Sequence, residues 1–323
     1  MIKQERYFLY VILTLVVLGG FCYGMFHLSS EDYSARQNEH RRKLGAVYMT
    51  LNNPFYDIID EEIRTAVENH GDILITRDTA LSVERQTEEI KELVDRGVEL
   101  LFVNPVDWEQ IEPAIESAYL ARIPVIAIDT NVQDDRYVMS TVVSDNYMAG
   151  QQCASHLISH AEGGNIALLK HSEARSSVDR MQGFCDVIAQ YDTFRIVDEE
   201  ECLGQLELAM PAMERMLERH PEINVVMALN DPAAMGAMAA LRMAGRLDDV
   251  MIYGVDGVPE TKEMIAEGHM TATAGQSPRT IGQRAAEQAY RILEGREHAR
   301  TIKLPTRLWY RENIFDSNIE GWD

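Results

Sequence analysis

Positive charge is scarce in this chain. Its 323 residues include 30 Lys and Arg against 52 Asp and Glu, which gives a formal net charge of −22. Binding to nucleic-acid phosphates needs a concentrated Lys/Arg surface. The composition therefore argues against a nucleic-acid partner and leaves open a protein that binds a neutral ligand. Aromatic residues are also few, but 46% of the residues are hydrophobic, as in a folded protein, and the length suffices for two domains.

Cysteines are few and scattered. Beyond the N-terminal region the chain has Cys153, Cys185 and Cys202, an odd number without regular spacing, which favours buried small hydrophobes over a disulfide framework. His156 and His160 follow Cys153 at positions i+3 and i+7 of one helix, so a metal site is conceivable. The preferred interpretation is that the cysteine packs in the core and the histidines face solvent. We predict no metal.

Signatures of nucleotide chemistry are missing as well. No G-x-G-x-x-G follows the first apolar run, and no Walker loop occurs anywhere in the chain. Carboxylate pairs such as Asp129 and Asp256 could imitate a glycosidase, but nothing in the sequence suggests a raised pKa for either. We therefore predict neither an enzyme nor a cofactor.

The N-terminus contains a long apolar run without Asp, Glu, Lys or Arg, "YFLYVILTLVVLGGFCYGMFHL" (Tyr7–Leu28). Its length is close to the roughly 20 residues of a membrane-spanning helix. We predict a cytoplasmic N-terminus (1–6), a transmembrane anchor (7–28) and a polar tether (29–43), with the body of the chain outside the cytoplasm. Lys3 and Arg6 favour this orientation, although "HRRK" on the other side weakens it.

Two other fates of this segment stay open. A cleaved secretory signal has a shorter apolar core and a small-residue cleavage site, and neither is obvious before "SSEDYSARQNEH". Cys22 invites a lipoprotein interpretation, but bulky Phe21 stands where lipoprotein processing wants a small residue.

From Leu44 onward, short apolar runs alternate with amphipathic segments, which is typical of parallel sheets covered by helices. Ten strands are predicted, and a single open sheet of that size would be unusual, so we expect two α/β halves that divide near Ser144. The late helix 279–295 could return to the first half. The predicted strands are 44–51, 72–78, 99–105, 124–130, 137–145, 164–170, 194–200, 223–229, 250–256 and 270–276.

Polar side chains gather at the carboxyl ends of these strands, where open α/β sheets bind ligands. Planar amides and carboxylates satisfy hydroxyl groups that both donate and accept, and aromatic faces cover the C–H faces of sugar rings. Taken singly, such residues often cap helices; together they indicate a sugar site. They are Asn52, Asn53, Phe55, Tyr56, Asn104, Asp107, Asp129, Asp145, Asn230, Asp231, Asp256 and Gln276.

The stretch "TLNNPFYDIID" (50–60) combines both roles. We expect Asn52 and Pro54 to shape the start of the first helix. We expect Asn53, Phe55 and Tyr56 to face the cleft.

Eight motifs occur in an order and spacing that resemble the periplasmic ribose-binding-like family of sugar ABC transporter substrate-binding proteins. They are "LNNPFY", "NPVD", "PVIAIDT", "VSDNYMAG", "RMQGF", "ALNDPAAMGAMAAL", "IYGVDGVPE" and "TAGQSPRTIGQRA". The resemblance covers about residues 44 to 310 and implies two similar doubly wound parallel-sheet lobes, joined by three crossings, with a monosaccharide between them. The implied lobes are 44–144 plus 277–305, and 145–276 plus 306–323.

The resemblance also implies site residues. Asn53, Phe55 and Tyr56 would contact the ligand from the first lobe, and the matching polar positions are Asp129, Asn230, Asp256 and Gln276. Thr130 stands where ribose binders have an arginine, and Val178 replaces a second one. Arg175, His171, Glu173 and Ser176 are possible replacements, Gly204 stands near a family aromatic, and Arg180 is interpreted as structural. Thr130 and Arg175 complete the predicted set, and ribose itself is doubtful.

The predicted function is a membrane-anchored extracytoplasmic binding protein for a monosaccharide or polyol. Its closed form would feed a sugar ABC importer or signal to a membrane histidine kinase. A LacI-type regulator shares this fold but needs a helix-turn-helix before the core, where this chain has its apolar segment.

Overall fold

The computed structural model describes residues 17–21, 23, 25 and 41–322. Most of the predicted anchor Tyr7–Leu28 and nearly all of the tether lie outside these residues. Within the described ranges, no helix combines the length and the apolar character that a membrane span requires. The compact body begins at Lys43.

The first lobe of the body is built on a six-stranded, all-parallel sheet in the order β11-β5-β4-β3-β1-β2. Central strands such as β3 are buried along their whole length, as expected for a sheet covered on both faces. Helices α3 and α11 pack on one face, and α4 and α5 on the other. The elements are β1 (Lys43–Tyr48), β2 (Ile73–Asp78), β3 (Leu100–Val103), β4 (Val125–Asp129), β5 (Ser140–Ser144), β11 (Thr301–Leu304), α3 (Pro54–Asn69), α4 (Val83–Asp95), α5 (Glu112–Leu120) and α11 (Pro278–Leu293).

The second lobe repeats this design in the order β12-β10-β9-β8-β6-β7, with β12 as its antiparallel strand. Its elements are β6 (Gly164–Lys170), β7 (Phe194–Glu201), β8 (Val225–Ala228), β9 (Met251–Asp256), β10 (Ala272–Gly275), β12 (Arg307–Tyr310), α6 (Asn146–His160), α7 (Arg175–Ile188), α8 (Leu206–Arg219), α9 (Asp231–Met243), α10 (Pro259–Glu267), and the short turns η1 (Leu247–Asp249) and η2 (Ile314–Asp316). The predicted two-lobed α/β fold with parallel sheets is confirmed.

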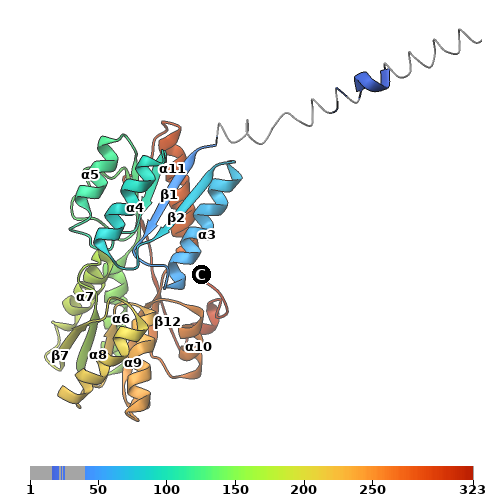
Figure 1. The fold of residues 1–323 in the computed structure, drawn as a ribbon. Coiled ribbons are helices and arrows are strands. Elements are labelled where there is room, and N and C mark those ends of the chain that lie inside the picture. Colours follow the sequence, from blue (N-terminus) through green and yellow to red (C-terminus); the bar gives the residue numbers. More distant parts are fainter. Residues whose placement is uncertain (1–16, 22, 24, 26–40, 323) are drawn as a thin grey trace, which may run out of the picture. The chain divides into compact units, whose positions relative to one another are not determined.

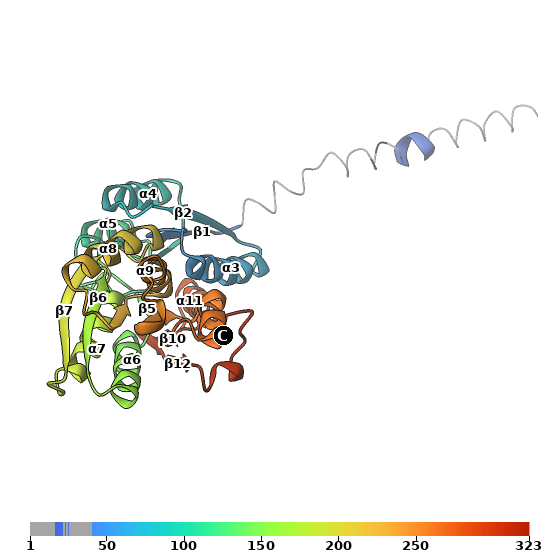
Figure 2. The ribbon, with the colours of Figure 1, turned by 90° about the horizontal axis from the view of Figure 1, so that it is seen from below.

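The chain crosses between the lobes three times: after β5, between β10 and α11, and between β11 and β12. Figures 1 and 2 show α11, coloured for the end of the chain, beside the early helix α3. Arg279 of α11 pairs with Glu62 of α3 at 2.7 Å, so the late helix returns to the first lobe, as expected. All ten predicted strands are present, and β11 and β12 were missed.

The start of α3 corrects one expectation. Asn53, rather than Asn52, is the N-cap, because its side-chain oxygen accepts a hydrogen bond from the Phe55 N–H at 3.0 Å. Pro54 occupies the first helical position, as expected. The Asn52 amide instead reaches the other lobe and donates to Gln205 at 2.8 Å.

The cysteine and histidines of α6 also differ from expectation in part. Cys153 is fully buried, but His156 is buried too, with its Nδ1 3.0 Å from the Tyr253 hydroxyl and its ring stacked on His160. Among the described residues, no group of three His, Cys, Asp or Glu side chains is arranged to hold a metal ion.

Candidate ligand-binding site

A cavity lies between the lobes at the carboxyl ends of both sheets. Its volume is about 30 Å³. Hydrogen bonds join the lobes beside it, such as those from Asn52 to Gln205 and from the Ser176 N–H to Thr130, so the lobes are closed on one another. Its lining is drawn from both lobes: Met49, Thr50, Asn53, Phe55, Tyr56, Asp129, His171, Ala174, Ser176, Arg180, Leu203, Gly204, Gln205, Leu229, Asn230 and Asp256.

Two carboxylates occupy equivalent positions in the two lobes. Asp129 ends β4 and Asp256 ends β9, each is 2% exposed, and each has a positive φ, 67° and 137°. Non-glycine residues rarely adopt such angles, which cost of order 1–3 kcal/mol and cluster at functional sites. The chain therefore turns sharply at both strand ends, and both carboxylates line the cavity.

Each carboxylate uses one oxygen within the protein. Asp129 Oδ2 accepts hydrogen bonds from the Tyr56 hydroxyl at 3.3 Å and the Asn104 amide at 3.4 Å. Asp256 Oδ1 accepts one from the Gln276 amide at 2.7 Å. The other oxygens, Asp129 Oδ1 and Asp256 Oδ2, are buried without a hydrogen-bond partner, and so is Gln276 Oε1.

Burial changes the acidity of this pair. It raises the pKa of Asp129 to about 6, although the nearby Arg180 guanidinium opposes the shift. Burial also raises the pKa of Asp256 well above its usual range. Nothing in the sequence suggested these raised pKa values, because a sequence does not show which acidic groups are fully enclosed.

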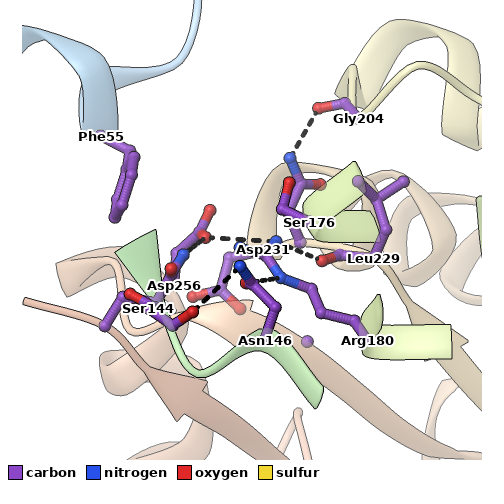
Figure 3. Close-up of polar contacts among 12 residues, drawn as sticks. Phe55, Ser144, Asn146, Ser176, Arg180, Gly204, Leu229, Asp231 and Asp256 are labelled. Carbon is purple, nitrogen blue, oxygen red and sulfur yellow. Dashed lines mark hydrogen bonds and ion pairs between the residues drawn. The ribbon is translucent and has the colours of Figure 1, made fainter. Parts of the chain in front are cut away.

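Arg180 supplies positive charge between the lobes. Its side chain is 4% exposed and is held by Asn146, which accepts from Nε at 2.8 Å, and by the Leu229 carbonyl, which accepts from Nη1 at 2.7 Å. The same Nη1 lies 3.8 Å from Asp256 Oδ1 (Figure 3). Arg180 was interpreted as structural, yet it lines the cavity as well as packing the lobe. The sequence did contain a signal for this role, because Arg180 is a basic residue within the buried stripe of α7, between Ser176 and Phe184.

Two asparagines that line the cavity, one from each lobe, also cap the helix that follows them. Asn53 caps α3, and Asn230 caps α9 by accepting from the Ala233 N–H at 3.0 Å. The Asn230 amide also donates to the Gly204 carbonyl at 3.1 Å. Gly204 has a φ of +67°, and a Cβ there would lie 2.8 Å from the Asn230 nitrogen. A residue with a side chain at position 204 would therefore disturb this amide.

The aromatic pair lines the first-lobe wall. Phe55 and Tyr56 meet edge to face, with ring centroids 5.7 Å apart, and both belong to the first-lobe core. Figure 3 shows Phe55 across the space from Asp256 and Arg180. The pair thus combines core packing with exposure to the cavity.

Of the nine residues predicted to contact the ligand, three lie outside the cavity lining. Gln276 is next to it, through its bond to Asp256. The Thr130 hydroxyl accepts a hydrogen bond from the Ser176 N–H of the other lobe at 2.9 Å. Arg175 pairs with Asp179 at 2.8 Å and lies over the Trp108 ring, 4.9 Å from its centroid. Thr130 and Arg175 therefore make contacts between the two lobes rather than lining the cavity.

Of the possible replacements for the missing arginines, His171 and Ser176 line the cavity. Glu173 does not line it; its backbone carbonyl accepts a hydrogen bond from the Trp108 N–H. Gln205 lines the cavity but was not predicted from the sequence. It lies in the loop after the carboxyl end of β7, which is where ligand-binding residues are expected in such a sheet. Met49 and Thr50 follow β1 in the same way.

Comparison with known proteins gives four consistent findings. The profile of a family described as periplasmic binding protein domain matches residues 44–297. The ribose import binding protein of Bacillus subtilis is 30% identical over 273 residues, which are 84% of this chain and 88% of that protein. An ABC transporter solute-binding protein from Mycobacterium smegmatis, solved with bound glycerol, is 28% identical with a TM-score of 0.81, over 85% of this chain and 96% of that one. A fructose-binding periplasmic domain of a hybrid two-component system is 26% identical, also with a TM-score of 0.81, over 85% and 93%.

Proposed function

This chain belongs to the periplasmic binding protein domain family, and from that premise we propose that it binds a monosaccharide or related polyol outside the cytoplasm. The two lobes close on the ligand, because closure completes contacts that neither lobe can make alone. The closed form then delivers the sugar to an ABC importer. The relatives named above, one of them a ribose import protein, support this assignment.

The observation that carries the proposal is the set of unpaired buried acceptors. Six buried side-chain atoms of the described residues lack a hydrogen-bond partner, although one of them, Glu89 Oε2, is paired with Arg77; three others belong to Asp129, Asp256 and Gln276. Buried acceptors are normally paired. Neighbouring Asp231, equally buried, accepts from two backbone N–H groups and two threonine hydroxyls. The free oxygens of Asp129 and Asp256 belong to residues that line the cavity, and that of Gln276 lies next to it, so together they call for a ligand that donates several hydrogen bonds.

A sugar or cyclitol meets this need. Each of its hydroxyls donates one hydrogen bond and accepts others, so it can serve the carboxylates and accept from Arg180. The cavity sets one guanidinium against two buried carboxyl groups and so offers no excess positive charge to an anionic ligand, which favours a neutral one. We assign Asn53 and Asp129 as first-lobe contacts, Asn230, Asp256 and Arg180 as second-lobe contacts, and Gln276 as a contact at the crossing. Phe55 and Tyr56 cover the ring.

A thermal-shift panel of pentoses, hexoses and cyclitols tests the binding claim. We expect at least one sugar to raise the melting temperature, since a ligand that binds the folded state stabilises it. Asp256→Asn keeps the side-chain size but replaces one of the two carboxyl oxygens with an amide nitrogen that cannot accept a hydrogen bond, so it should abolish most of the shift. Asp179→Asn is the matched control, because Asp179 pairs with Arg175 outside the cavity. Absence of a shift with every sugar would contradict the proposal.

A sensor of sugar is the second candidate. It is favoured by the similarity to a fructose-binding domain of a hybrid two-component system. In that case the closed form would be recognised by a membrane histidine kinase. Deletion of the gene separates the two: loss of uptake of the labelled sugar supports import, whereas intact uptake with a lost transcriptional response to the sugar supports sensing.

The N-terminal segment completes the proposal. We infer that Tyr7–Leu28 anchors the protein in the membrane and that residues 29–43 tether the binding body outside the cytoplasm. The apolar, uncharged composition of the segment supports this.

A further inference from the structure

The C-terminal segment runs from the second lobe to the aromatic wall of the cavity. After β12 the chain forms η2, whose Ile314 is fully buried in the second-lobe core. Residues 317–322 follow, and we call them the strap. Figure 1 shows the end of the chain between α3 of the first lobe and α10 of the second.

The strap is fastened to the second lobe by Lys262 of α10. This lysine is fully buried, and its ammonium donates to the carbonyl oxygens of Asn318 and Gly321, both at 2.6 Å. Hydrogen bonds to a buried ammonium are costly to lose. This end of the strap is therefore held firmly.

The other end of the strap contacts the first lobe. Trp322 packs against the first-lobe core, and its ring meets Phe55 at a centroid distance of 5.8 Å and an interplanar angle of 64°. Phe55 in turn meets Tyr56, whose hydroxyl donates to Asp129. The three rings form a chain of edge contacts that leads from the strap to the carboxylate of the site.

We propose that Trp322 is a positioning residue that holds Phe55 in the orientation facing the ligand and ties the first lobe to the second through the strap. This inference deepens the proposed function and rests on it for the role of Phe55. When the lobes separate, the Trp322–Phe55 contact is the one that yields, because the Lys262 bonds cost more to break. The strap therefore favours the closed arrangement and slows ligand release.

The test compares the full-length chain, kept in mild detergent, with Trp322→Ala, Trp322→Phe and Phe315→Ala. Phe315 is the matched control, since it lies in the same C-terminal segment but is 74% exposed. We expect Trp322→Ala to speed hydrogen exchange in the first turn of α3 without ligand. It should also weaken sugar binding by about two- to tenfold, the size of an aromatic pair contribution, mainly through faster dissociation. Trp322→Phe should restore most of the protection from exchange and most of the sugar affinity. Phe315→Ala should resemble the unmodified chain in both measurements.

The loss should also depend on the ligand, being larger for a cyclic sugar than for an acyclic polyol, because a ring face is what Phe55 covers. Unchanged exchange and unchanged affinity in Trp322→Ala would overturn the inference, as would equal losses in Phe315→Ala. If the unmodified chain binds no sugar, the proposed function fails, while the exchange comparison still decides whether the strap holds Phe55.

Discussion

At the residue scale, the site is a balance of enclosed charges. Asp129 and Asp256 are almost completely buried, and Arg180 lies close enough to compensate only part of their charge. A ligand hydroxyl that donates to Asp129 Oδ1 favours the ionised form. Binding and ionisation are therefore coupled.

This coupling predicts how affinity depends on pH. The pKa of Asp129 is raised to about 6 in the ligand-free protein, so a bound hydroxyl must displace its proton below that pH. We expect affinity to fall by up to about tenfold per pH unit below pH 6, and we expect Asp256, whose pKa burial also raises, to extend the dependence to higher pH. Asp129→Asn should bind more weakly but lose the part of the dependence centred near pH 6. Calorimetric titrations between pH 5 and pH 8 measure this, and equal affinities at pH 5 and pH 7 would contradict it.

The same shift has the opposite sign for stability. The folded, ligand-free protein holds the Asp129 proton more tightly than the unfolded chain, whose pKa is near 3.8. The contribution of this group to the free energy of unfolding is therefore fully present below pH 3.8 and is lost as the pH rises through 6, in all about 3 kcal/mol. Above pH 6, hydrogen bonds from ligand hydroxyls to the ionised Asp129 offset this loss in the free energy of unfolding.

Residue roles were the least predictable part of the site. Asp129, Asp256, Asn53 and Asn230 follow from their places at strand ends, because the topology of a parallel sheet brings those ends together. The cavity-facing position of Arg180 depends on its side-chain path, from α7 past Asn146 to the Leu229 carbonyl, which no local pattern reveals.

At the element scale, helices α6 and α7 position the second-lobe part of the site. They touch at two glycines: a Cβ at Gly150 would overlap the Arg180 carbonyl oxygen, and one at Gly183 would overlap that of Tyr147. The close approach of the two backbones sets where α7 lies. It thereby places Ser176 and Arg180, which both line the cavity.

Gly150→Ala should therefore damage both the fold and the site. Because the new methyl group meets backbone rather than a movable side chain, we expect a loss of about 3 kcal/mol in the free energy of unfolding. We also expect weaker sugar binding, since α7 must shift. Ser155→Ala, on the exposed side of α6, is the control and should change neither. Denaturant unfolding and titration with the best sugar of the panel measure both effects, and a fully stable Gly150→Ala would show that the helices separate easily.

Element prediction succeeded where burial dominates the pattern. The apolar runs of the central strands became strands because their residues are enclosed between helices, as in β3 and β4; the edge strand β7 was predicted although most of it is exposed or half-buried. Strands β11 and β12 have four residues each, lie at sheet edges and include exposed positions, so their patterns resemble those of loops. Their pairing with β5 and β10 is set by the returning chain rather than by local sequence.

At the scale of the whole molecule, closure rests on contacts that join residues far apart in the chain. Asn52 donates to Gln205, the Ser176 N–H donates to Thr130, and the Trp108 N–H donates to the Glu173 carbonyl. A two-lobed body with three crossings was predictable from the alternation of elements and the resemblance. These bridging partners were not, because they depend on the angle between lobes.

Attachment to the membrane is the remaining prediction at this scale. We expect the full chain to stay in the membrane fraction after an alkaline carbonate wash, because an apolar stretch of the length of Tyr7–Leu28 inserts stably into a bilayer. Deletion of residues 7–28 should leave the protein in the soluble fraction. Cys22→Ser is the matched control: an anchor that acts through its apolar residues tolerates this change, whereas a lipid-held protein would be released. A soluble mature chain that begins beyond residue 28 would instead identify the segment as a cleaved signal and remove the anchor from the proposed function.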